Sequence, residues 1–166
     1  MAGTIEGERI PVERTLAWAL RQLAASLGPL RAASLYRTRP VSTVSSPISQ
    51  PDFLNTAALV HTALPADGVL ALAKALELAA GRRRGPRFGP RPLDIDLLLY
   101  GDRRADDPEL ALPHPRLRER RFVLAPLAEI APDLPVPPDG ATVRELLARL
   151  GEPGEEDAVE RIGWEA

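Results

Sequence analysis

The chain has 166 residues, 45% of them hydrophobic, and a formal net charge of −2. This length suits one compact domain with a single core and leaves no room for a second full domain. The absence of cysteine excludes disulfides and cysteine-ligated zinc sites, and the net charge argues against a general nucleic-acid binder.

The first residues show no targeting signal. Met1–Arg14 mixes acids, glycine and proline without the apolar core of a signal peptide. No stretch of the sequence approaches the ~20 consecutive apolar residues that a bilayer requires. We therefore expect a cytoplasmic protein that has no membrane partner.

In the first half of the chain, two strands are predicted between two helices. Pro11–Leu27 is expected to be a helix because its leucines recur at helical spacing. Leu30–Thr38 and Phe53–Thr62 are expected to be strands, and apolar and polar side chains alternate along the second. A loop rich in serine and proline, Arg39–Asp52, connects them. Pro65–Ala80 repeats the helical pattern.

The second half begins with a loop, Gly81–Arg91, whose glycines and prolines discourage regular structure. Leu93–Tyr100 is predicted to be a third strand. Phe122–Ile130 is predicted to be a short helix. A capping box at Thr142–Glu145 is expected to open a last helix that ends near Leu150.

This order of elements favours an α+β fold in which helices cover a mostly antiparallel sheet. Residues 1–150 are expected to form the domain. Residues 151–166 are expected to form an acidic C-terminal tail.

Asp94 and Asp96 are the main candidates for metal binding. They are two residues apart on a predicted strand, so both carboxylates leave the same face, with Cα atoms roughly 6–7 Å apart. Mg²⁺ prefers oxygen ligands and is commonly held by one or two carboxylates together with substrate phosphates. The alternative is that the two acids form the solvent face of an amphipathic strand.

The loop Gly81–Arg91 places five arginines next to these acids. Guanidinium groups can fork around phosphates. Metal-binding acids beside phosphate-binding arginines are the minimal equipment for phosphoryl or pyrophosphoryl transfer. The alternative is a solvated basic loop.

Glu77 is a further candidate because it falls in the last turn of its predicted helix, where a negative charge is unfavourable. Either Arg82 or Arg84 compensates that charge, or Glu77 accepts hydrogen bonds from a ligand. The sequence leaves both alternatives open.

Aromatic and imidazole side chains supply the remaining candidates. Phe53 and Asn55 share a strand face that suits a planar heterocycle, although Phe53 and Phe122 can each belong to the core instead. His114 can polarise a phosphate, but a lone loop histidine is more often inert.

Taken in order, these motifs resemble the 6-hydroxymethyl-7,8-dihydropterin pyrophosphokinase family. The resemblance implies a ferredoxin-like α+β fold, ATP as co-substrate, two Mg²⁺ ions, and transfer of pyrophosphate to the hydroxymethyl oxygen of the pterin with release of AMP. It implies small-molecule substrates rather than nucleic acid, and we expect a monomer. It extends from about residue 11 to residue 150 and is carried by Ser34–Thr38, Gln50–Asn55, Gly89–Asp96, Leu112–Pro115 and Arg120–Leu127.

The same resemblance implies roles for individual residues. Asp94 and Asp96 match the metal-binding acids, and Asp96 is also a candidate for removing the hydroxyl proton. Arg82 and Arg91 are expected to stabilise the transferred group. The pterin contacts match Thr38, Phe53, Asn55 and Phe122. The nucleotide and phosphate contacts match Lys74, where the family usually has glutamine, and Glu77, Arg82, Arg84, Arg91, His114 and Arg120.

The start of the chain departs from the family. Its members begin with an apolar strand that runs into a Gly-Ser-Asn-x-Gly turn, and here only Ala2–Gly7 faintly resembles that turn. The first central strand is therefore expected to be missing, unless the start is misassigned or another segment such as Val159–Trp164 fills its place. Two rival functions remain open: a non-catalytic pterin- or nucleotide-binding relative, and a metal-dependent nuclease or RNA-binding domain.

Overall fold

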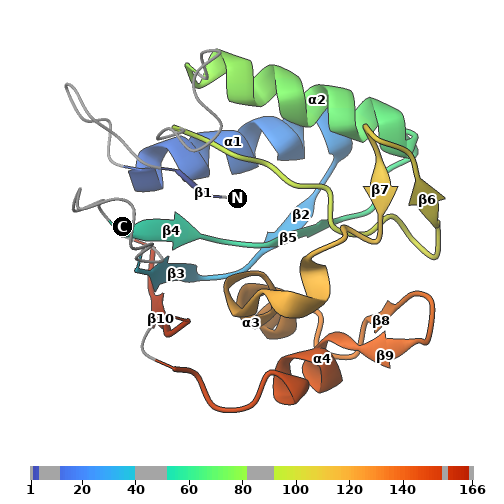
Figure 1. The fold of residues 1–166 in the computed structure, drawn as a ribbon. Coiled ribbons are helices and arrows are strands. Elements are labelled where there is room, and N and C mark those ends of the chain that lie inside the picture. The colour runs from blue at the N-terminus through green and yellow to red at the C-terminus, as the bar shows by residue number, and fades with distance from the viewer. Residues whose placement is uncertain (1, 4–11, 40–51, 82–91, 155–156, 165–166) are drawn as a thin grey trace.

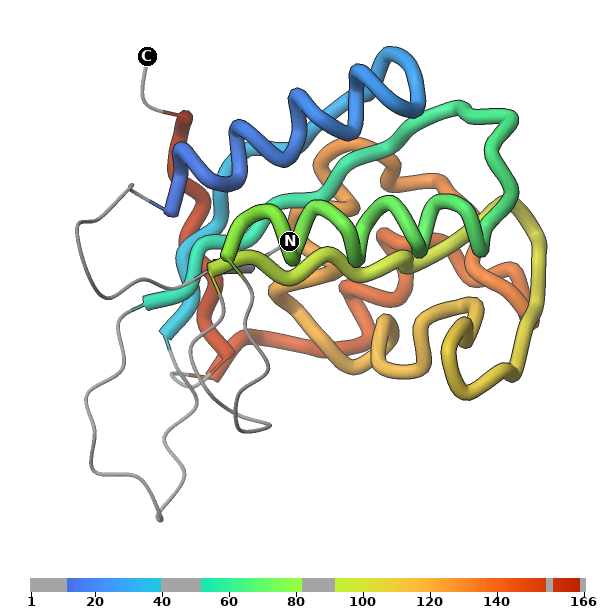
Figure 2. Tube along the Cα trace, turned by 90° about the horizontal axis from the view of Figure 1, so that it is seen from above, coloured from blue at the N-terminus to red at the C-terminus, as the bar shows by residue number. Residues whose placement is uncertain are grey.

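The computed structural model describes residues 2–3, 12–39, 52–81, 92–154 and 157–164. Strands form a middle layer that is covered by helices on both faces (Figure 1). Seen from above, α1 and α2 lie side by side over one face (Figure 2), whereas α3 packs on the other face with α4 beyond it. The helices are α1 (Val12–Leu27), α2 (Ala66–Ala79), α3 (Arg121–Ile130) and α4 (Val143–Arg149).

The helices form where the local sequence predicts them. In α1 the buried residues Leu16, Ala19, Leu23 and Leu27 recur at helical spacing and make one apolar stripe. At the start of α4, Thr142 Oγ1 accepts a hydrogen bond from Glu145 N, and the Glu145 carboxylate accepts one from Thr142 N at 2.8 Å. The predicted capping box is therefore confirmed. None of the helices within the described residues is both long and apolar enough to cross a membrane.

The strands form antiparallel pairs. The largest sheet has the order β1-β4-β3-β10, and β2 pairs separately with β5. Two small hairpins, β6–β7 and β8–β9, and a short 3₁₀ turn, η1, complete the described elements. The predicted α+β class is confirmed. The bounds are β1 (Ala2–Gly3), β2 (Leu30–Ala32), β3 (Leu35–Thr38), β4 (Phe53–Asn55), β5 (Ala58–Val60), β6 (Ala105–Asp106), β7 (Ala111–Leu112), η1 (Leu117–Glu119), β8 (Pro135–Val136), β9 (Ala141–Thr142) and β10 (Val159–Ile162).

The two predicted strands 30–38 and 53–62 are each divided in two, which corrects the prediction. Both breaks meet at the same place in the structure. Ala33 N donates to Ala57 O at 2.9 Å, and the Thr56 hydroxyl donates to Ala33 O at 3.1 Å. The Thr56 hydroxyl takes a main-chain acceptor that a strand ladder would otherwise use, so regular pairing stops there.

The predicted strand Leu93–Tyr100 is also corrected, because only Asp94 makes a strand-type bridge. The segment still runs through the layer between the helices (Figure 1). Leu93 is fully buried against the α1 side, whereas Leu98 packs into the core on the α3 side. A regular strand needs a neighbouring strand of similar length. Within the described residues β1 is only two residues long, and it pairs with β4.

The C-terminal segment, expected to be an acidic tail, adds a strand to the sheet. β10 pairs with β3 from Val159 opposite Thr38 to Ile162 opposite Leu35. Trp164 Nε1 donates to Ala33 O at 3.1 Å and continues this attachment. Since β10 lies at the edge of the sheet order, it does not fill the central place that was considered for it.

Candidate active site

A pocket of about 440 Å³ lies between α2 and the segment that follows the arginine-rich loop. From α2 it receives side chains spaced at i, i+4, i+7 and i+8, which lie on one stripe of the helix. From the other wall it receives both candidate acids, so the two carboxylates face one pocket. The lining residues are Leu70, Lys74, Glu77, Leu78, Asp94, Ile95 and Asp96.

Glu77 ties the two walls together. Its side chain is buried, with only 4% exposed, and Glu77 Oε1 accepts a hydrogen bond from Ile95 N at 2.7 Å. Ile95 stands between the two acids, so this bond fixes the main chain that carries Asp94 and Asp96. The alternatives predicted from the sequence, Arg82 or Arg84 or a ligand, stay open because both arginines lie outside the described residues; the main-chain donor Ile95 N is an additional contact that was not predicted. Ile95 is eighteen residues away along the chain, and no local pattern signals such a contact.

Lys74 is the cation of the pocket wall within the described residues. Its ammonium lies 3.7 Å from the Glu109 carboxylate, and both side chains are largely exposed. Ion pairs of this kind contribute about 0–1 kcal/mol to stability. Lys74 can therefore exchange Glu109 for an anionic ligand at little cost.

The acids fit a Mg²⁺ site that is completed by a substrate. Asp94 is partly buried and Asp96 is exposed at the pocket. Within the described residues no group of three or more histidine, cysteine, aspartate or glutamate side chains is arranged to hold a metal. Two neighbouring carboxylates at one pocket match the way Mg²⁺ binds together with phosphate oxygens and water.

His114 is held in a defined orientation. Its main-chain N–H donates to Leu98 O at 2.8 Å, and its Nδ1 accepts a hydrogen bond from Arg116 N at 3.2 Å. Because Nδ1 is the acceptor, the proton of the neutral imidazole resides on Nε2. Nε2–H of His114 can then donate a hydrogen bond to an anionic oxygen.

Arg120 contacts an aromatic ring and feels the charge of both candidate acids. Its guanidinium carbon stands 5.5 Å from the centroid of the Phe122 ring, which is 37% exposed. Burial and the nearby charge of Arg116 lower the pKa of Arg120, while the carboxylates of Asp96 and Asp94 oppose this shift. Arg120 is thus within electrostatic reach of both acids.

The candidate pterin residues of the sheet lie together on neighbouring strands. Thr38 of β3 is opposite Phe53 of β4. The buried Asn55 donates through Nδ2 to Thr38 Oγ1 at 3.0 Å and to Tyr36 O at 3.5 Å. None of them lines the pocket of the two acids. Arg82, Arg84 and Arg91 fall outside the described residues, so their predicted roles stay predictions.

Known proteins share the sequence pattern of this chain. The profile of the family described as 7,8-dihydro-6-hydroxymethylpterin-pyrophosphokinase (HPPK) matches residues 7–132. The 2-amino-4-hydroxy-6-hydroxymethyldihydropteridine pyrophosphokinase of Methylorubrum extorquens is 45% identical over 149 residues, which cover 89% of this chain and 88% of that protein. The protein of the same name from Synechocystis sp. is 38% identical over 142 residues, covering 84% and 70%. That from Bacillus subtilis is 40% identical over 112 residues, covering 68% and 65%.

Proposed function

Since the chain belongs to the 7,8-dihydro-6-hydroxymethylpterin-pyrophosphokinase family, we propose that it transfers pyrophosphate from ATP to 6-hydroxymethyl-7,8-dihydropterin. The acceptor is the hydroxymethyl group, and the second product is AMP. The chain is an enzyme of folate biosynthesis. The observation that carries this function beyond the sequence similarity is the pocket that Asp94, Asp96 and Lys74 line together.

Asp94 and Asp96 are proposed to hold Mg²⁺, and we expect two ions. The metal would offset negative charge on the phosphates and on the departing AMP. Lys74, His114 and Arg120 are proposed to bind the triphosphate. Glu77 is proposed to contact the nucleotide from the α2 wall and, through its hydrogen bond from Ile95 N, to keep the two acids on the other wall.

Transfer joins the hydroxymethyl oxygen to the β-phosphorus of ATP and breaks the bond from that phosphorus to the oxygen retained by AMP. The hydroxyl proton must leave, and Asp96, exposed at the pocket, is proposed to accept it. The side chains contribute mainly by holding the two substrates in line and by placing positive charge around the transferred group. Arg82 and Arg91 are proposed to supply part of that charge.

The pterin is proposed to bind at the end of β3 and β4. Asn55 and Thr38 would contact its polar edge, and Phe53 and Phe122 would contact its faces. The hydrogen bond between Asn55 and Thr38 supports this arrangement because it fixes the orientation of the amide. We further propose that the fold is ferredoxin-like and that the enzyme is a cytoplasmic monomer.

The function is tested by measuring AMP formed from ATP and Mg²⁺ with and without 6-hydroxymethyl-7,8-dihydropterin. AMP formation that depends on the pterin is the expected result. Binding of pterin or nucleotide without AMP formation would replace the proposal by a non-catalytic binding module. Cleavage of RNA or DNA in the same preparation would point to the nuclease alternative.

A further inference from the structure

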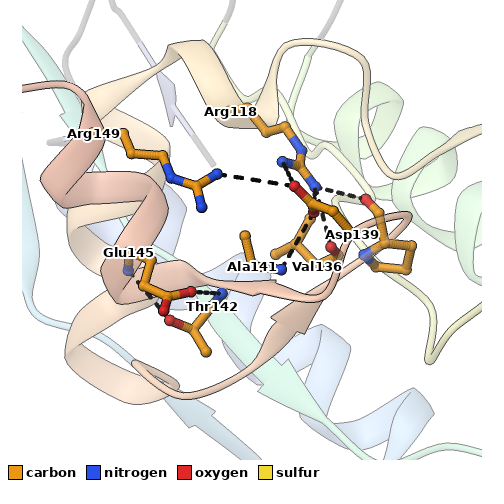
Figure 3. Close-up of polar contacts among 8 residues, drawn as sticks. Arg118, Val136, Asp139, Ala141, Thr142, Glu145 and Arg149 are labelled. Carbon is orange, nitrogen blue, oxygen red and sulfur yellow. Dashed lines mark hydrogen bonds and ion pairs between the residues drawn. The ribbon is translucent and has the colours of Figure 1, made fainter.

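Arg118, in the 3₁₀ turn η1 and two residues before Arg120, makes several side-chain contacts with the β8–β9 hairpin. Its Nη2 lies 2.6 Å from Asp139 Oδ1 and its Nη1 lies 3.2 Å from Asp139 Oδ2 (Figure 3). The same Nη2 donates to Val136 O at 3.1 Å and to Pro137 O at 3.0 Å. One guanidinium thus joins η1 to the β8–β9 hairpin through a two-pronged ion pair and two main-chain acceptors.

Asp139 is itself fixed at the tip of this hairpin. Its Oδ1 accepts a hydrogen bond from Ala141 N at 3.3 Å, and its Oδ2 lies 3.9 Å from Arg149 Nη1 of α4 (Figure 3). The hydrogen bonds from Arg118 and from the Ala141 main chain lower the pKa of Asp139 to about 2. The carboxylate is therefore charged at neutral pH, and it contacts η1, its own hairpin and α4.

Arg121, the residue after Arg120, makes a second set of contacts. The nearly buried Arg121 donates through Nη2 to Gly151 O at 2.6 Å and to Leu150 O at 3.3 Å, and its Nε lies 3.3 Å from Asp157. These contacts fix the first turn of α3 to the end of α4. Arg120 stands between Arg118 and Arg121 in the sequence and takes part in neither set of contacts. It lies next to Phe122 and within electrostatic reach of the two acids.

We propose that Arg118 and Asp139 are positioning residues for nucleotide binding. Their ion pair fixes the turn Leu117–Glu119 on the β8–β9 hairpin and so holds Arg120 toward Asp94 and Asp96. This inference rests on the proposed function, since it assigns the pair an effect on a bound triphosphate.

The geometry argues for orientation rather than for stability alone. Half of the Asp139 side chain and about a third of that of Arg118 are exposed (50% and 32%), and ion pairs this open contribute little to folding. A two-pronged guanidinium–carboxylate pair does, however, set a direction, and a lysine ammonium does not reproduce it. A small displacement of a group that binds a reacting phosphate has a large kinetic effect.

The test compares Asp139→Asn and Arg118→Lys with the wild-type enzyme. Both changes keep the size and polarity of the side chain but break the two-pronged pair. The affinity for α,β-methylene-ATP with Mg²⁺ is measured by calorimetry, and KM for ATP, KM for the pterin and kcat are measured by AMP release. We expect affinity for the analogue to fall about tenfold and KM for ATP to rise with it, while KM for the pterin stays within about twofold. Arg118→Lys gives the same answer if Asp139→Asn does not fold.

The decisive measurement repeats Asp139→Asn in an Arg120→Ala background. If Asp139 acts through Arg120, the second change has no further effect on affinity for the analogue. An equal loss in both backgrounds refutes the inference, as does wild-type affinity in Asp139→Asn.

Asp133→Asn is the matched control. It breaks the exposed 3.0 Å pair between Asp133 and Arg144 in the same part of the fold, and its kinetics should equal those of wild type. A tenfold loss in this control also overturns the inference, because any surface charge would then have the effect. A wild-type enzyme that forms no pterin-dependent AMP refutes the proposed function, whereas an active wild type with an unaffected Asp139→Asn variant refutes only the positioning role.

Discussion

Replacing Glu77 by alanine tests whether the buried carboxylate holds the acid-bearing segment in place. A hydrogen bond to a charged group contributes about 1.5–3 kcal/mol. Removing an acid from the last turn of α2 returns about 0.3–1 kcal/mol through the helix dipole. The free energy of unfolding should therefore fall by about 1–2 kcal/mol, and the melting temperature by about 2–8 °C for a chain of this size.

The assay has a structural and a functional part. Circular dichroism during heating, without nucleotide, measures the loss of stability in Glu77→Ala. Titration of AMP formation with Mg²⁺ should show a higher half-saturating concentration, because Ile95 stands between the two acids and loses its acceptor. Glu77→Gln keeps an uncharged acceptor for Ile95 N and should lose about half as much stability.

Glu109→Gln is the control, since it breaks only the exposed ion pair with Lys74 and should change the free energy of unfolding by less than about 0.5 kcal/mol. If Glu77→Ala is as stable as this control and has the wild-type Mg²⁺ requirement, Glu77 does not hold the acid-bearing segment.

Three further changes test other parts of the structure. Asp96→Ala should lower kcat at least about a hundredfold and leave the melting temperature unchanged because the side chain is exposed; near-wild-type turnover would refute its assigned role. Trp164→Phe removes the indole donor to Ala33 O. It should lower the free energy of unfolding, measured in urea, by about 0.5–1.5 kcal/mol. An unchanged urea midpoint would mean that Trp164 adds nothing to the attachment of the C-terminal segment. Burial and a hydrogen bond to Glu129 raise the pKa of Tyr36 from 10.0 to about 12. The folded protein thus keeps a proton that the unfolded chain loses, and stability should fall as pH rises between these values. Tyr36→Phe should make unfolding less pH-dependent in this range; an unchanged slope would contradict the assignment.

The helices were predictable because their signals are local. The apolar stripe of α1 and the capping box of Thr142 and Glu145 each lie within a few turns of one element. The breaks between β2 and β3 and between β4 and β5 were not predictable from either strand alone. They arise where Ala33 meets Thr56 and Ala57, more than twenty residues away, and the alternation of side chains along each strand carries no trace of that meeting.

One feature of the candidate site was predictable from the sequence and another was not. Spacing alone placed Asp94 and Asp96 on one side of the chain, and the structure has both of them in one pocket although the segment is not a regular strand. Spacing could not predict the contact between Glu77 and Ile95, because its donor is a main-chain N–H and has no residue type to recognise.

Contacts over long separations also explain why the C-terminal segment belongs to the sheet. Glu129 of α3 accepts hydrogen bonds from the Ser34 main chain and hydroxyl, from the Tyr36 hydroxyl and from Arg161 of β10. These donors come from segments far apart in the sequence, so each looks like an ordinary surface residue when it is considered alone. One carboxylate in α3 satisfies all of them and thereby links β3, which carries Thr38, to the edge strand. The acidic composition of residues 151–166 therefore does not show how this segment is attached. β10 is held by main-chain pairing with β3 and by an arginine.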